Sequence, residues 1–157
     1  MHCLALILGI TGPLGQAVAA VLARRGWAIR ALTRRPGGQR PRLPYPVDWV
    51  EGDALDAASV RAASEGAALL FHGANPPGYR RWREDGLPML RHSIEAARSS
   101  AATILFPANV YVYSTQSPPH VDEATPRTPT TNKGKVRLEM ERMLEQATND
   151  HGVRVIA

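Results

Sequence analysis

Residues 4–15 read Leu-Ala-Leu-Ile-Leu-Gly-Ile-Thr-Gly-Pro-Leu-Gly, an apolar run that leads into three glycines with the spacing G-x-x-G-x-x-G. A strand of a parallel sheet has such a run because helices cover both faces of the sheet. Glycines after the strand let the chain turn sharply and bring backbone N–H groups against an anion at a helix N-terminus. The stretch therefore predicts a strand followed by a turn suited to the pyrophosphate of a dinucleotide.

Three glycines alone would equally fit a tight structural turn with a glycine packed under a helix, so the flanking sequence decides between the two readings. Pro13 stands where a helix would begin, with a φ angle suited to the first helical turn. Apolar residues then recur at helical spacing from Leu14 to Leu22, and Gly26 ends the pattern. Residues 27–33 read as a second strand, which completes a strand–turn–helix–strand unit.

Strand and helix signals alternate along the rest of the chain, which predicts an α/β fold with a doubly wound parallel sheet. The expected strands are residues 47–51, 68–73, 103–108 and 153–157, and the expected helices are 56–64, 85–99 and 132–148. Asp56 is the expected cap of the first of these helices. A chain of 157 residues is most simply a single domain.

Composition narrows the function classes. The formal net charge is +5, but the arginines are scattered as pairs and form no helical stripe, so a phosphorylated small molecule is favoured and nucleic acid is not expected. The single cysteine, Cys3, is expected to be a small buried hydrophobe in the first strand, and a chain with no disulfide suits a reducing cytoplasm. No apolar run is long enough for a membrane span, and no zinc-type spacing predicts a metal site.

The end of the second strand indicates which dinucleotide is bound. A carboxylate at this point bonds the ribose 2′-hydroxyl of NAD, whereas an arginine pairs with the 2′-phosphate of NADP. The chain has Thr33-Arg34-Arg35 there and no Asp or Glu. Because guanidinium is always charged and grips phosphate with two N–H groups, we predict NADP(H), with NAD as the less favoured cofactor.

Several motifs, in order along the chain, resemble the short-chain dehydrogenase/reductase superfamily in its extended or atypical NAD(P)-dependent epimerase/dehydratase-like branch. Thr11-Gly-Pro-Leu-Gly15 resembles the TGxxGxxG turn of that branch, and Gly52-Asp-Ala-Leu-Asp56 resembles its GDxxD motif. The segments 71–74 and 112–113 are similar to those that follow the fourth and fifth strands. The resemblance covers nearly the whole chain and implies a Rossmann fold.

The resemblance also implies a cofactor site. Its expected members are Gly9, Thr11, Gly12, Pro13, Leu14 and Gly15 at the pyrophosphate, Arg34 and Arg35 at the 2′-phosphate, Asp53 and Ala54 at the adenine, and Gly73, Ala74 and Lys135 at the nicotinamide ribose. Each has a plainer alternative: Asp53 could be a turn residue, and Lys135 a solvated lysine on a helix.

The chain departs from the family at the catalytic residues. The family uses Y-x-x-x-K with a serine or threonine after the fifth strand, and the lysine lowers the pKa of the tyrosine toward neutrality. Lys135 fits the lysine, but Thr131 stands at the tyrosine position and Asn109 at the serine position. An aliphatic hydroxyl is too weak an acid to replace a phenol, so Thr131 is expected to begin a helix. Tyr79 is the candidate for a substitute acid.

Three functions therefore remain open. The first is the NADP(H)-binding domain of an atypical member whose chemistry, if any, uses Tyr79 with Lys135. The second is a non-catalytic module that senses the cofactor or binds a protein partner. The third is an incomplete reductase or epimerase, since the branch carries a C-terminal substrate-binding portion and residues 1–157 correspond to the cofactor-binding part alone. The substrate is open, and the superfamily implies a homodimer.

Overall fold

The computed structural model describes residues 3–34, 40–76 and 81–157. Its centre is a parallel sheet with the strand order β3-β2-β1-β4-β5-β6. The strands are β1 (Leu4–Leu8), β2 (Ala28–Thr33), β3 (Asp48–Glu51), β4 (Ala67–His72), β5 (Thr103–Leu105) and β6 (Val155–Ile156). The chain winds outward from β1 in one direction and then returns to wind outward from its other side. This order confirms the predicted doubly wound sheet of the Rossmann type.

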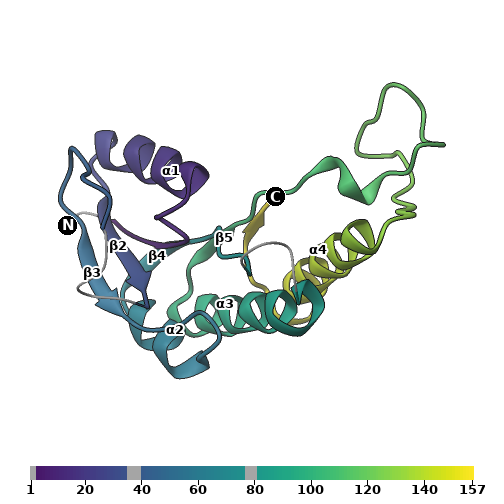
Figure 1. Ribbon diagram of the computed structural model, residues 1–157. Coiled ribbons are helices and arrows are strands. Elements are labelled where there is room, and N and C mark those ends of the chain that lie inside the picture. The colour runs from purple at the N-terminus through teal and green to yellow at the C-terminus, as the bar shows by residue number, and fades with distance from the viewer. Residues whose placement is uncertain (1–2, 35–39, 77–80) are drawn as a thin grey trace.

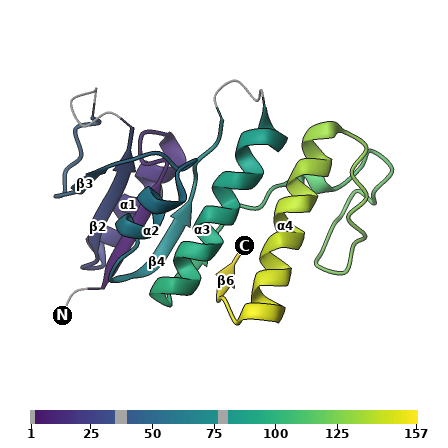
Figure 2. The ribbon, with the colours of Figure 1, turned by 90° about the horizontal axis from the view of Figure 1, so that it is seen from below.

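Helices cover the sheet on both faces. On one face lies α1 (Pro13–Arg24), and on the other lie α2 (Ala57–Ala63), α3 (Leu87–Ser100) and α4 (Asn132–His151) (Figures 1 and 2). Alternate residues of β1 therefore enter different cores: Leu6 and Leu8 join the core beneath α2, α3 and α4, whereas Ala5 and Ile7 join the core beneath α1. Burial on both faces explains why the sequence of β1 is apolar without alternation.

Local sequence sets the helix ends that were predicted. The side chain of Asp56 accepts hydrogen bonds from the backbone N–H groups of Ala58 and Ser59 at the start of α2. The Thr131 hydroxyl accepts from the N–H of Gly134 at the start of α4. Both contacts satisfy N–H groups that a helix leaves without an internal partner.

Element bounds differ from the prediction in the second half of the chain. The expected helix from residue 85 is preceded by a π-helical turn, η2 (Trp82–Gly86), so α3 itself begins at Leu87. The fifth strand ends at Leu105 because Pro107 has no N–H for the ladder, and a short 3-10 turn, η3 (Val110–Val112), follows. β6 pairs with β5 over two residues rather than five.

The expectation that Cys3 is buried was wrong. Cys3 lies just before β1 and its side chain is exposed. Only its backbone carbonyl joins the sheet, by accepting from the N–H of Ala28. Leu4, the next residue, is partly buried, and full burial begins at Ala5. In the described ranges, no helix combines the length and the apolar character that crossing a bilayer requires.

A close backbone approach holds β1 against β4 at the carboxyl edge of the sheet. Gly9 has a φ of +89°, and a Cβ placed on it would lie 2.5 Å from the carbonyl oxygen of Gly73. The N–H of Gly73 in turn donates to the carbonyl of Leu8 at 2.9 Å. Any side chain at residue 9 would push these two strand ends apart.

We expect Gly9→Ala to lower the free energy of unfolding by about 2–4 kcal/mol, since it adds a backbone clash to a positive-φ strain of about 1–2 kcal/mol. Gly26→Ala is the matched control. Gly26 also has a positive φ of +82°, but a Cβ there would meet nothing within 4 Å. Urea denaturation of both variants checks this, and equal losses would contradict the clash.

A buried histidine lies at the end of β4. His72 is 3% exposed, its Nδ1 lies 2.8 Å from the Ser93 hydroxyl, and its ring stacks on Phe106 with centroids 6.0 Å apart. The Ser93 hydroxyl donates to the carbonyl of Met89, which leaves its oxygen to accept from Nδ1–H. Burial, with a further contribution from the charge of Arg137, lowers the pKa of His72 from 6.5 to about 3.

This shift makes the fold sensitive to acid. The unfolded chain takes up a proton at His72 below about pH 6.5 and the folded chain does not, so stability is full above that pH and falls as the pH is lowered toward 3. We expect a loss of about 2 kcal/mol between pH 7.5 and pH 5 from this group. His72→Gln should remove this part of the pH dependence in urea melts. His120→Gln, at an exposed histidine, should retain it.

Candidate cofactor site

A cavity of about 780 Å³ opens at the carboxyl ends of β1, β2, β3 and β4. It lies where the winding of the chain reverses between β1 and β4, the place at which open α/β sheets bind their ligands. Its lining comes from four separate segments at or just after the end of a strand, with Met89 from α3: Leu8–Gly12, Leu32–Arg34, Gly52–Ala54 and Gly73–Asn75.

The glycine turn after β1 forms one wall of this cavity. Gly9, Thr11 and Gly12 line it, and the N–H of Gly12 donates to the carbonyl of Gly9 at 3.1 Å. Gly12 is also the N-terminal cap of α1, and having no side chain it leaves the N–H groups of the first turn uncapped. No acidic residue occupies that turn. This end of α1 therefore offers N–H groups and a positive helix dipole to an anion.

The wall formed by β2 and β3 carries a charge of each sign. Arg34 follows β2 directly and its side chain is exposed, with Thr33 beside it. Asp53 follows β3, and its Oδ1 accepts from the N–H of Leu55 at 3.0 Å, which leaves the second carboxylate oxygen available. The ring of His92 on α3 donates from Nδ1 to the carbonyl of Ala54 at 3.0 Å and holds this loop in place.

The opposite wall follows β4. Gly73 and Ala74 line the cavity, and Asn75 and Met89 join them. These last two were not assigned to the site from the sequence. Asn75 lies in a loop that could be recognised only as stiff and rich in proline, and Met89 belongs to a helix whose rotation cannot be read from its apolar spacing alone.

The structure separates the predicted cofactor residues into three groups. Those that line the cavity are Gly9, Thr11, Gly12, Arg34, Asp53, Ala54, Gly73 and Ala74. Pro13, Leu14, Gly15 and Lys135 do not line it. Arg35 lies outside the described residues, as does Tyr79, the candidate for a substitute acid.

Residues in the second group have other positions. Gly15 is buried in α1, where a Cβ would collide with the backbone of Gly9, so this glycine lets the helix pack close under the turn. Leu14 is 51% exposed. Lys135 lies on α4, one turn after Thr131, with an exposed side chain.

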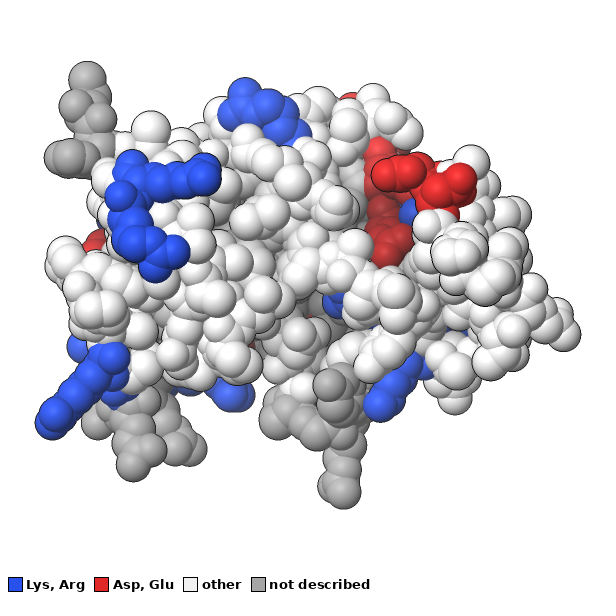
Figure 3. All heavy atoms as spheres, turned by 90° about the horizontal axis from the view of Figure 1, so that it is seen from above, with Lys and Arg blue, Asp and Glu red and all other residues white. Residues whose placement is uncertain are grey.

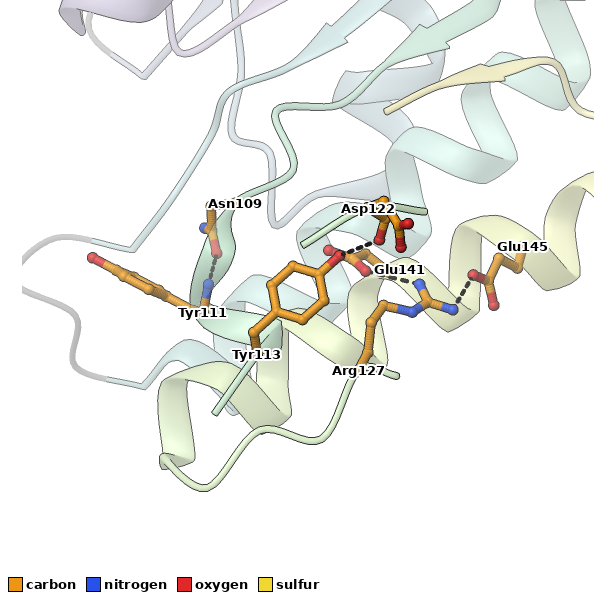
Figure 4. Close-up of polar contacts among 7 residues, drawn as sticks. All are labelled: Asn109, Tyr111, Tyr113, Asp122, Arg127, Glu141 and Glu145. Carbon is orange, nitrogen blue, oxygen red and sulfur yellow. Dashed lines mark hydrogen bonds and ion pairs between the residues drawn. The ribbon is translucent and has the colours of Figure 1, made fainter. Parts of the chain in front are cut away.

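The two positions where the chain departs from Y-x-x-x-K and its serine are both engaged in local structure. The Thr131 hydroxyl caps α4, as described above. The side-chain oxygen of Asn109 accepts from the N–H of Tyr111 at 3.0 Å and begins the η3 turn. Figure 4 shows this contact, with the Tyr111 ring directed away from Tyr113.

A second cavity, of about 580 Å³, lies between the segment after β5, the carboxyl half of α4 and β6. Arg127 crosses its wall: one terminal nitrogen lies 2.9 Å from Glu141 and the other 2.6 Å from Glu145 (Figure 4). These contacts fasten the long segment before α4 onto the helix, and they raise the pKa of Arg127.

Charge is distributed unevenly over the face that carries α1. Acidic atoms gather mainly toward the α4 end of this face, whereas basic atoms are spread across it and are most extensive at the opposite end (Figure 3).

Across the part of the chain that is described, no three His, Cys, Asp or Glu side chains come together in a way that could hold a metal ion.

Comparison with solved structures shows the same fold in larger proteins. UDP-glucose 4-epimerase from Brucella ovis, solved in complex with NAD, has a TM-score of 0.83 and 23% identity, over 98% of this chain and 50% of the epimerase. Glucuronic acid dehydrogenase from Chromohalobacter salexigens has a TM-score of 0.82 and 18% identity, over 100% of this chain and 60% of that one. The chain thus spans about half the length of these proteins.

Sequence comparison agrees with the fold. A segment of 69 residues, 44% of this chain, is 36% identical to sterol demethylase protein B of Methylococcus capsulatus (Bath) and covers 21% of that protein. The sequence profile of the NAD dependent epimerase/dehydratase family matches residues 5–157. With the doubly wound sheet and the glycine turn at its switch point, this match shows that the chain belongs to the NAD dependent epimerase/dehydratase family.

Proposed function

We propose that residues 1–157 form an NADP(H)-binding domain. One observation supports this above the others: a single cavity brings together the glycine turn after β1, Arg34 after β2, Asp53 after β3 and Gly73 after β4. A dinucleotide has a pyrophosphate between two nucleosides, and its length suits a site that crosses several strand ends. In this proposal the pyrophosphate lies on the glycine turn and the adenosine lies over β2 and β3.

The preference for the phosphorylated dinucleotide rests on Arg34. The side chain lines the cavity at the end of β2, where NAD-binding proteins place a carboxylate against the ribose. The Brucella ovis epimerase is in complex with NAD, so the family does not decide the matter. We infer NADP(H) from the charge at this one position, with Arg35 as the predicted second arginine.

The proposed domain lacks the usual acid and serine of the family. Thr131 has a hydroxyl whose oxygen is engaged by the N–H of Gly134, and threonine does not ionise near neutral pH. Asn109 can donate a hydrogen bond to a carbonyl, but it cannot relay a proton. We therefore propose that the domain binds the cofactor whether or not it catalyses a reaction. Lys135 is the predicted partner of the nicotinamide ribose, and Tyr79 is the predicted substitute acid.

The wider functional predictions extend beyond the cofactor site. The chain spans about half the length of its structural relatives. We therefore propose only a reaction class, an oxidoreductase or epimerase/dehydratase-like reaction, and no particular substrate. The homodimer and the cytoplasmic location remain predictions.

A calorimetric titration with NADPH, NADP⁺, NADH and NAD⁺ tests the cofactor assignment. We expect the phosphorylated pair to bind more tightly, and Arg34→Ala to weaken NADPH binding by about tenfold to a hundredfold, the value of a hydrogen bond to a charged group. The same variant should change NADH affinity by less than about twofold, because NADH has no 2′-phosphate.

Arg25→Ala is the matched control for this titration. Arg25 is also an exposed arginine, but it lies after α1, near the start of β2 and so at the other end of the sheet. The Arg25→Ala variant should bind NADPH with the same affinity as the wild type. If NADH and NADPH bound equally well to the wild type, the assignment of Arg34 would be wrong. If none of the four bound, the proposed function itself would fail.

A further inference from the structure

Arg137 is a charged residue in the interior of the molecule that the motifs do not assign. It lies on α4, two residues after Lys135, and its side chain faces the core while that of Lys135 faces solvent. Only 4% of its surface is exposed. Arginine is almost never buried to this extent without a partner of opposite charge, because removing a guanidinium from water is strongly unfavourable.

The contacts of Arg137 hold its guanidinium against the segment that follows β5. The guanidinium carbon lies 4.5 Å from the centre of the Phe106 ring, a distance typical of a cation–π contact. One terminal nitrogen donates to the carbonyl of Pro107, and the other lies 3.8 Å from the sulfur of Met140. Among the described residues, the buried Nε of Arg137 has no hydrogen-bond acceptor.

Among the residues that the structure describes, no neighbouring carboxylate forms an ion pair with this cation. Glu141, one turn further along α4, has a favourable electrostatic effect on it, while the Glu141 carboxylate is bonded to Arg127 at 2.9 Å and shares that arginine with Glu145. His72, the other titratable group near Arg137, stays neutral at physiological pH because it is buried. Within the described parts of the chain, no hydrogen bond or ion pair joins Arg137 directly to an acid, so its positive charge is balanced only through space.

Arg137 lies against the segment after β5, one strand beyond the lining of the cofactor cavity at the end of β4. Phe106 and Pro107 follow β5, and β5 pairs with β4, after which Gly73 and Ala74 line the cavity. In a doubly wound sheet each half binds one mononucleotide, so a dinucleotide with its adenosine over β2 and β3 has its nicotinamide over β4 and β5.

We propose that the buried guanidinium of Arg137 makes this site selective for the reduced dinucleotide. This inference rests on the proposed function. The oxidised nicotinamide ring carries a positive charge and the reduced ring is neutral, so a buried cation nearby repels only the oxidised form. If the ring and the guanidinium lie ~10 Å apart, two unit charges at an effective dielectric constant of ~20 interact strongly enough to favour one form by on the order of tenfold.

The test compares the ratio of the dissociation constants of NADP⁺ and NADPH in the wild type and in three variants. The wild type should prefer NADPH on the order of tenfold. Arg137→Met fills the same space without charge and should bring the ratio close to one. Arg137→Lys keeps the charge and should keep most of the preference, although it changes the contact with Pro107. Arg142→Met removes an exposed cation of the same helix and should leave the ratio unchanged.

Adenosine 2′,5′-bisphosphate serves as a probe without nicotinamide. Its affinity should be the same in Arg137→Met as in the wild type, which separates the effect of charge on the ring from damage to the site. Should Arg137→Met fail to fold, the wild-type ratio still decides, since equal or tighter binding of NADP⁺ overturns the proposal. An unchanged ratio in folded Arg137→Met overturns it as well. Absence of binding by every dinucleotide overturns the proposed function along with it.

Discussion

The approach of two backbone segments, at Gly9 after β1 and Gly73 after β4, is the constraint on which the rest of the structure depends. A Cβ on Gly9 would lie 2.5 Å from the carbonyl of Gly73, so neither the strand pair nor the turn tolerates a larger residue at that point. The two halves of the sheet wind away from this contact in opposite directions. The close contact requires glycine at both strand ends. Because glycine has no side chain, nothing at this point fills the cavity above the contact.

Chemical character differs between the two sides of this constraint. Around β2 and β3 the cavity wall has an exposed arginine, a carboxylate and a loop held by a histidine, which suits recognition of a phosphorylated ribose and a base. Around β4 and β5 the interior holds a neutral His72 and a cationic Arg137 that both contact Phe106. Burying polar groups is energetically costly. Their concentration near the proposed nicotinamide end therefore supports the proposal that this end of the site distinguishes a charged nicotinamide ring from a neutral one.

Local sequence predicted those features that depend on neighbours in the chain. The glycine turn, the cap at Asp56 and the cap at Thr131 each follow from a backbone requirement that a few adjacent residues satisfy. Gly15 packs α1 against the turn, and its place in the cofactor site stays a prediction, because the spacing of the glycines does not distinguish binding from packing.

Features that depend on how separate elements pack could not be predicted. Lys135 and Arg137 are two residues apart, and only the rotation of α4 against β5 decides that the first is exposed and the second buried. Met89 reaches the cavity for the same reason, through the placement of α3. Cys3 adjoins an apolar strand in the sequence, yet it lies just before β1 and is exposed.

A crystal structure of the chain grown with NADPH is the most direct test of the central claim, that the carboxyl-edge cavity is a dinucleotide site. We expect the pyrophosphate against the backbone of Gly9–Gly12 at the start of α1, the 2′-phosphate within hydrogen-bond distance of Arg34, and the nicotinamide beyond Gly73 on the β5 side. NADPH bound instead in the cavity around Arg127, or a cavity that stays empty at saturating NADPH, would contradict the account.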